Sequence, residues 1–121
     1  MYIYVTENTF HLAKKDQIVG SYIYDKFNEA IAKVEALLVE PETHCCRYLI
    51  IRLGGFLKIR GKILAIPHEI CEVEDLGKIK ITWRKESLLA APSPINIRQL
   101  TPNEDELIQD YFQNQPKLVT S

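Results

Sequence analysis

Short hydrophobic runs, each bounded by glycine, proline or polar residues, dominate the first two thirds of the chain. The clearest covers residues 45–53, where alternate side chains fall on opposite faces of an extended strand. Together with five similar runs it gives six predicted strands, over residues 18–24, 33–40, 45–53, 62–66, 70–74 and 78–83. Strands at this short spacing, without helical patterns between them, predict an all-β barrel or sandwich.

The run at residues 33–40 allows a second interpretation, because alanine, glutamate and leucine also favour helices. Pro41 ends the run, and Glu42-Thr43 supplies a turn before the next strand. We therefore predict that the two runs on either side of this turn form a hairpin.

The last third of the chain changes from strand to helix. Residues 85–90 predict a short helix, which a proline-containing linker follows. A longer helix should begin after Thr101, because Thr101 can cap it, Pro102 suits its first position and Glu104 can complete a capping box. Its apolar side chains form a single stripe of Leu107, Ile108, Tyr111 and Phe112. This stripe should pack on its own barrel or on a second copy of the chain.

Composition places the chain among ordinary globular domains. Its 121 residues are 46% hydrophobic and 26% charged, with a formal net charge of −1. Because this charge predicts no bulk attraction to nucleic acid or to an anionic bilayer, we do not expect nucleic acid as a partner. No apolar run approaches the ~20 residues of a transmembrane segment, and no secretory signal pattern opens the sequence. We expect a cytoplasmic protein.

Local charge is less even than the total. Residues 43–68 contain five basic side chains and no acid, whereas residues 100–115 contain four acids and no lysine or arginine. The basic residues are Arg47, Arg52, Lys58, Arg60 and Lys62. Two solvated faces would explain this pattern, and a basic docking patch is the alternative.

The three cysteines, Cys45, Cys46 and Cys71, are an odd number and make a poor disulfide framework. The adjacent pair would point to opposite faces of a strand, and it lacks the spacing that brings zinc ligands together. We therefore expect reduced thiols and no metal site. A redox- or metal-responsive regulator that uses these three residues is an alternative function.

Nothing in the sequence indicates an enzyme. His68-Glu69 could supply a base for a cysteine nucleophile, but a histidine after Pro67 fits the rim of a barrel better. Gly54-Gly55 lacks the later glycine, lysine and hydroxyl residue of a phosphate-binding loop. We predict no catalytic residues and no cofactor.

Several segments together resemble the PRC-barrel family. They are residues 33–43, Arg47-Tyr48-Leu49-Ile50-Ile51, Gly54-Gly55-Phe56-Leu57, Gly61-Lys62 and Ile66-Pro67. The resemblance implies a small six-stranded antiparallel PRC-type β-barrel over residues 18–92. An N-terminal extension (residues 1–17) would precede it, and a linker, the C-terminal helix and a frayed tail (residues 93–121) would follow it.

The chain departs from the family pattern at two turns. The family's Asp-Gly turn after the first strand is Asn28-Glu29 here, and its Thr-Gly turn is Thr43-His44. In addition, His68 stands where the family commonly has an aromatic residue after the barrel proline. These changes are compatible with the fold.

The resemblance implies a binding protein. Family members include the cytoplasmic domain of the photosynthetic reaction-centre H subunit and the C-terminal domain of a ribosome-maturation factor, and stand-alone members are often dimeric. We therefore expect a homodimeric adaptor that binds a protein of a cytoplasmic or membrane-peripheral assembly. Any membrane association would then pass through that partner. A weak RNA- or ribosome-associated module is a further alternative.

The candidate docking surface is the loop between Gly54 and Gly61. Its partner-binding residues would be Phe56, Leu57, Lys58, Ile59 and Arg60. The apolar members offer anchors and the basic members offer steering charge. The other interpretation is that the apolar members close the barrel or the dimer.

Overall fold

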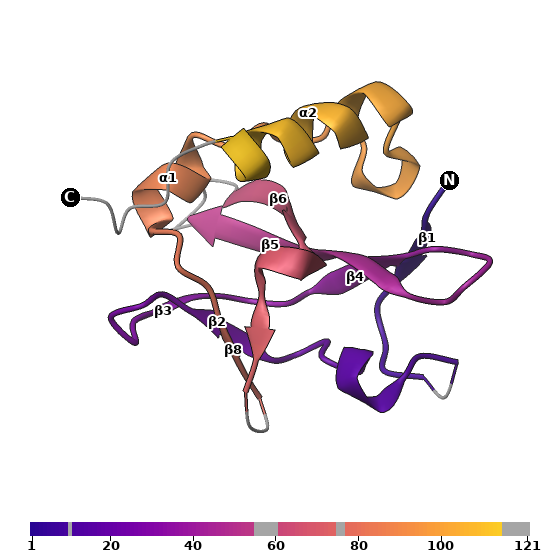
Figure 1. Ribbon diagram of the computed structural model, residues 1–121, viewed down its shortest axis with the longest axis horizontal. Helices are drawn as coiled ribbons and strands as arrows, with labels where there is room; N and C mark the ends of the chain where they lie inside the picture. The colour runs from indigo at the N-terminus through magenta and orange to yellow at the C-terminus, as the bar shows by residue number, and fades with distance from the viewer. Residues whose placement is uncertain (10, 55–60, 75–76, 115–121) are drawn as a thin grey trace.

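The computed structural model describes residues 1–9, 11–54, 61–74 and 77–114. Within these ranges two four-stranded sheets lie one above the other, and helices cover the upper sheet (Figure 1). The strands are β1 (Ile3–Val5), β2 (Tyr22–Tyr24), β3 (Ala30–Lys33), β4 (Ala36–Val39), β5 (Cys46–Gly54), β6 (Gly61–Pro67), β7 (Glu72–Val73) and β8 (Lys78–Lys80). The helices are α1 (Lys85–Leu89) and α2 (Pro102–Asn114), with 3-10 turns at Lys14–Asp16, His68–Ile70 and Ile97–Gln99.

The larger sheet has the order β1-β4-β5-β6, and all its neighbours are antiparallel. Its centre is apolar on both faces, because Tyr48, Leu49, Ile50 and Ile51 follow one another in β5 and are all buried. Figure 1 shows why: α2 lies along one side of β5 and β6, and the smaller sheet lies on the other. The sequence of a strand that is covered on both faces is a continuous run of hydrophobic residues.

The smaller sheet has the order β3-β2-β8-β7 and contains one parallel pair, β2 with β8. The chain passes from this sheet into the larger one directly after β3. The backbone N–H of Val34 donates to the carbonyl of Ser21 at 2.8 Å, and that of Glu35 donates to the carbonyl of Ile50 at 2.8 Å. Two consecutive residues therefore bond to different sheets and hold them together.

The prediction of a strand-rich domain followed by a short and a longer helix is confirmed, but the prediction of a six-stranded antiparallel barrel is wrong. The described residues form eight strands, one pair is parallel, and the two sheets do not close into a single barrel. The first predicted strand is shortened because Gly20, at φ 96°, lies in a turn. β1 was missed because it has only three residues and is ordered by its pairing with β4. The proposed domain limits stay a prediction.

Helix α2 packs on its own domain, which decides between the two predicted alternatives. Ile108 and Phe112 are buried, and the Phe112 ring meets the ring of the buried Trp83 edge-on, with centroids 5.0 Å apart. The predicted capping box is present: the N–H of Glu104 donates to Thr101 Oγ1 at 3.1 Å, and the N–H of Thr101 donates to Glu104 Oε1 at 3.2 Å. The fourth member of the stripe, Leu107, is 52% exposed.

The two turns that depart from the family pattern contain two left-handed residues. Asn28 has φ 67° and His44 has φ 58°, a region that glycine adopts at much lower cost than other residues. The side chain of Asp25 supports the first turn, because its Oδ1 accepts from the N–H groups of Phe27 at 2.8 Å and Glu29 at 3.0 Å. The turn geometry is thus kept although the glycines are absent.

Candidate functional site

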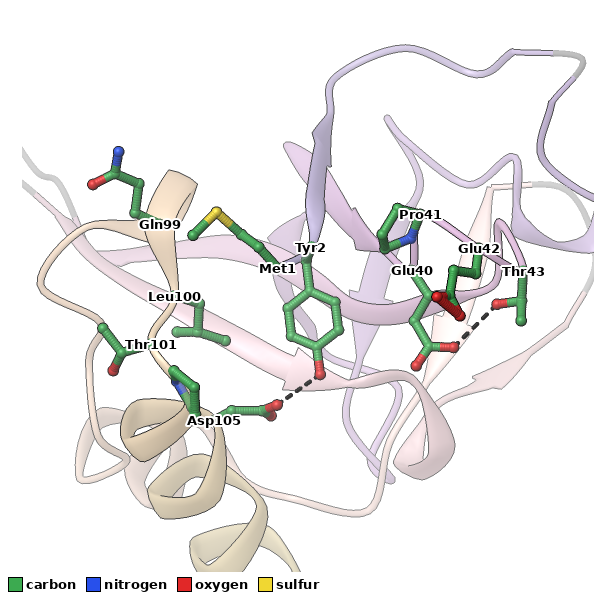
Figure 2. Close-up of a pocket in the computed structure, with 11 residues that line it drawn as sticks. Met1, Tyr2, Glu40, Pro41, Glu42, Thr43, Gln99, Leu100, Thr101 and Asp105 are labelled. Atoms are coloured by element: carbon green, nitrogen blue, oxygen red, sulfur yellow. Dashed lines mark hydrogen bonds between the residues drawn. The ribbon is translucent and has the colours of Figure 1, made fainter.

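A cleft of about 670 Å³ lies among the described residues at the N-terminal end of α2. Three segments distant in the sequence form it: the residues before β1, the turn between β4 and β5, and the start of α2. Figure 2 shows the ring of Tyr2 projecting between the turn at Pro41 and the helix at Asp105. The N-terminal residues, the turn between β4 and β5 and the start of α2 therefore contribute to one site.

The walls of this cleft are apolar and acidic. The lining residues are Met1, Tyr2, Glu40, Pro41, Glu42, Thr43, Gln99, Leu100, Thr101, Pro102 and Asp105. Three of them are carboxylic acids and none is a lysine or arginine. Glu40 is partly satisfied, because Thr43 Oγ1 donates to its Oε1 at 3.0 Å and Arg47 Nε lies 3.8 Å from its Oε2. Glu42 is exposed at the rim.

A single carboxylate organises the floor of the cleft. The hydroxyl of Tyr2 donates to Asp105 Oδ2 at 2.7 Å, and the hydroxyl of Tyr48 donates to Asp105 Oδ1. Gln109, one turn further along α2, donates from Nε2 to the Tyr48 hydroxyl at 2.9 Å. The rings of Tyr2 and Tyr48 pack edge to face with centroids 5.7 Å apart. Tyr48 thus joins β5 to the helix, and Tyr2 joins the segment before β1 to the same carboxylate.

These phenols stay protonated at neutral pH. Burial, followed by the hydrogen bond to Asp105, raises the pKa of Tyr2 to about 12. Burial, followed by the bond to Asp105, raises the pKa of Tyr48 still more. Neither hydroxyl is therefore a ready base or nucleophile, and the negative charge of the cleft comes from its carboxylates.

The arrangement is suited to binding. Apolar lining residues with carboxylates beside them favour a segment that carries both apolar and basic side chains. The start of α2 is also held in place, because the N–H of Ile95 donates to Glu104 Oε2 at 2.8 Å. This hydrogen bond is the first cause of a lowered pKa at Glu104.

The predicted docking residues Phe56, Leu57, Lys58, Ile59 and Arg60 lie outside the described residues, so their role stays a prediction. The described members of the basic stretch do not act as one patch, because each has a different partner. Arg47 lies beside Glu40, Arg52 Nε lies 3.4 Å from Glu35 Oε2, and Lys62 Nζ donates to the carbonyl of Leu89.

The three cysteines are free thiols in different surroundings. Cys45 is exposed and Cys46 is buried, so the adjacent pair points to different environments, as expected. Burial raises the pKa of Cys46 and that of Cys71, each to about 12. These two thiols therefore carry little of the thiolate on which oxidation and metal binding depend.

One buried acid lies near these thiols. The side chain of Asp16 is 3% exposed, and its Oδ1 lies 3.3 Å from His68 Nε2. The distance fits an ion pair with a protonated histidine, but the angles do not meet hydrogen-bond geometry, so we regard this as a contact only. Nowhere in the described ranges do three His, Cys, Asp or Glu side chains converge as metal ligands.

The cleft was not predicted from the sequence. The acids at its helical wall were noted only as part of an acidic stretch, and Tyr2 was placed in an extension. The capping box did indicate where α2 begins, and it was the only local signal near this site. Among the described residues, no helix has the length and apolar character required to span a bilayer.

Comparison with known proteins agrees with the fold. The sequence model of the PRC-barrel domain matches residues 13–86, which is more than half of the chain and contains β2 to β8. Comparison with curated proteins gave no significant match. The chain therefore belongs to the PRC-barrel family.

Proposed function

We propose that this protein is a non-catalytic adaptor that binds a protein of a larger cytoplasmic or membrane-peripheral assembly, and that it does so as a homodimer. The PRC-barrel is in general a non-catalytic domain family and suggests a small interaction module. The partner, the assembly and the dimer go beyond that family assignment.

The observation that carries the proposal is the cleft at the start of α2. It combines apolar lining residues with Glu40, Glu42 and Asp105, and it is shaped by elements that the Asp105 hydrogen bonds hold in place. A preformed hollow of this kind lowers the entropic cost of binding. Its chemistry favours a partner segment with apolar anchors beside lysine or arginine.

The experiment is a capture of partners with tagged protein from soluble and detergent-solubilised fractions of its own source, identified by mass spectrometry. Glu42→Lys reverses one exposed rim charge, and Glu7→Lys makes the same change at an exposed position outside the cleft. A specific complex that Glu42→Lys loses and Glu7→Lys keeps would support the proposal. Equal capture by all three proteins would contradict it.

Support for the homodimer comes from a separate apolar surface beside α2. Ile95 is 95% exposed and Leu107 is 52% exposed, and both border a small hollow of about 270 Å³. A projecting side chain next to a hollow can pair with its own copy across a two-fold axis. Leu89, another apolar residue that is 47% exposed, supplies a matched control on α1.

Sedimentation velocity distinguishes the outcomes. If this surface forms the dimer, Ile95→Asp and Leu107→Asp should give monomers, whereas Leu89→Asp should leave the dimer intact. A native chain that is monomeric at all concentrations would contradict the homodimer and leave the cleft proposal to be judged by its own experiment.

The redox- or metal-responsive alternative has less support. Two of its three residues, Cys46 and Cys71, have a raised pKa and face backbone carbonyls, with sulfur-to-oxygen distances of 3.5 Å to Tyr48 and 3.6 Å to Pro67. We therefore do not propose it as the function.

A further inference from the structure

The outer face of the smaller sheet is polar and aromatic, whereas its inner face is part of the core. Ile23 of β2 and Ile79 of β8 are fully buried. Their neighbours Tyr22, Tyr24, Lys78 and Lys80 point to the opposite side, since side chains alternate along a strand. In Figure 1 this sheet forms the lower layer, and the helices lie above the other sheet.

The pairing register brings aromatic and basic side chains together across three strands. Tyr22 is the direct partner of Lys33 on β3 and of Lys78 on β8. Two residues further along β2, Tyr24 is the direct partner of Lys80. Direct partners share a face of the sheet. Across the strands, one line of neighbours is therefore Lys33, Tyr22 and Lys78, and the next contains Tyr24 and Lys80.

The turn after β2 continues the same pattern. Phe27 is 57% exposed, and two cations approach its ring: Lys26 Nζ lies 5.3 Å and the Arg84 guanidinium carbon 5.6 Å from the centroid. Within the sheet, Lys78 Nζ lies 5.0 Å from the centroid of Tyr24. Three aromatic rings therefore follow one another along β2 and its turn, each beside at least one cation.

Carboxylates offset this charge only in part. Glu72 on β7 is the direct partner of Lys80, and Glu69 and Glu72 line a hollow of about 500 Å³ with Lys26 and Lys80. Among the described residues, none of the five cations of this face lies within ion-pair distance of an acid. The five are Lys26, Lys33, Lys78, Lys80 and Arg84.

We propose that this aromatic and basic face binds single-stranded nucleic acid. Unpaired bases would stack on Tyr22, Tyr24 and Phe27, and the neighbouring lysines and arginine would neutralise the phosphates. The rings follow one another along β2 and its turn, and the cations lie beside them, as phosphates lie beside the successive bases of an extended strand. The contacts use the π-face of a base and its phosphate, so little sequence preference is expected.

An acidic peptide would use the cations but would give no role to three aromatic rings in a row. An anionic membrane would use both, but it also requires apolar side chains that can enter the acyl region. On this face the cations lie against the rings, and Tyr22 keeps a polar hydroxyl among lysines. These observations favour a strand of nucleotides over a lipid surface.

This inference reverses the expectation drawn from the net charge of −1. The lysines of this face come from residues 26, 33, 78 and 80, and strand pairing brings Lys33, Lys78 and Lys80 together. The acids that balance them in the total include Glu40, Glu42 and Asp105, which lie in the cleft. The net charge therefore gives no information on how positive and negative side chains are divided between the two surfaces.

The test is fluorescence anisotropy at low salt with labelled single-stranded RNA of about ten nucleotides, its DNA counterpart, and a duplex of the same RNA. Stacking and phosphate neutralisation do not read the 2′-hydroxyl, so we expect RNA and DNA to bind alike and the duplex more weakly. Tyr22→Ala should weaken binding by about tenfold, and Tyr22→Phe should keep it.

A second pair of variants tests the phosphate contacts. Lys33→Gln with Lys78→Gln should lower the salt dependence of binding by about 1.4 units of slope, since each phosphate contact on a single strand contributes about 0.7. Lys14→Gln with Lys15→Gln removes the same charge at exposed positions outside β2, β3 and β8 and should change binding much less. The far-ultraviolet circular dichroism of each variant establishes that it is folded.

Four results would overturn the proposal. They are no binding at low salt, equal binding of the duplex, binding that Tyr22→Ala leaves unchanged, and an equal effect of the Lys14 and Lys15 pair. Co-sedimentation with vesicles of phosphatidylserine and phosphatidylcholine tests the alternative that this face binds an anionic membrane. Binding to these vesicles without binding to the oligonucleotides would also overturn it.

Discussion

Tyr2 and Asp105 are 103 positions apart in the sequence, and the hydroxyl of the tyrosine donates to the carboxylate at 2.7 Å. The second oxygen of the same carboxylate accepts from Tyr48 in β5. One side chain on the last helix thus connects the segment before β1 with the centre of the larger sheet. This connection forms the floor of the cleft.

Removal of this carboxylate should destabilise the protein. Asp105→Ala leaves the hydroxyls of Tyr2 and Tyr48 without their acceptor, and each unsatisfied polar group costs about 1–3 kcal/mol when it is buried. Because both tyrosines are only partly enclosed, we expect a total loss of about 2 kcal/mol in the free energy of unfolding, measured with urea. Asp110→Ala, at an exposed position of the same helix, should change it by less than about 0.5 kcal/mol. Equal losses would contradict this role for Asp105.

The two raised tyrosine pKa values predict a loss of stability in alkali. An unfolded tyrosine ionises near pH 10, whereas the pKa of Tyr2 in the folded chain is about 12 and that of Tyr48 is raised further. Their contribution is therefore complete below about pH 10 and is lost as the pH rises toward 12 and beyond. Urea unfolding at several pH values should show a smaller alkaline loss for Tyr48→Phe than for the native chain. Thr82→Ala removes an exposed hydroxyl and should lose as much free energy of unfolding in alkali as the native chain does.

The three thiols should react at very different rates. Cys45 is exposed, whereas burial raises the pKa of Cys46 and of Cys71 to about 12. Iodoacetamide labelling near neutral pH, followed by peptide mass spectrometry, should modify Cys45 first and the other two only slowly. In urea all three should react alike. Rapid labelling of Cys46 or Cys71 in the folded protein would favour the redox alternative instead.

The two left-handed turn residues should respond differently to glycine. His44 has φ 58° and Asn28 has φ 67°, and asparagine tolerates this region better than histidine. His44→Gly should therefore raise the free energy of unfolding by up to about 1 kcal/mol, and Asn28→Gly by less. Thermal and urea unfolding of both variants would measure the difference. A larger gain at Asn28 would contradict the explanation by backbone strain.

Features with local causes could be predicted from the sequence. Thr101, Pro102 and Glu104 are near neighbours, and the capping box that they form is present. The hairpin of β4 and β5 could also be predicted, because Pro41 and Thr43 separate two hydrophobic runs. In both cases the residues that decide the structure lie within a few positions of one another.

Features with distant causes could not be predicted in this way. β1 is ordered by the pairing of Ile3 with Val39, and β2 is joined to β8 by the pairing of Tyr22 with Lys78. The cleft depends on Tyr2 reaching Asp105, and the aromatic and basic face depends on the same β2–β8 register. Hydrophobic periodicity carries no information about which strands become neighbours, so both surfaces were missed.

The parallel pairing of β2 with β8 has a consequence for how the chain is made. During synthesis β2 emerges early, but its partner follows only after β3 to β7 have been translated. Until then one edge of β2 has no partner, and contacts between such distant segments form slowly. The smaller sheet therefore cannot form strand by strand in the order in which its strands are synthesised. Folding should instead be concerted, and should wait until Lys78–Lys80 has left the ribosome.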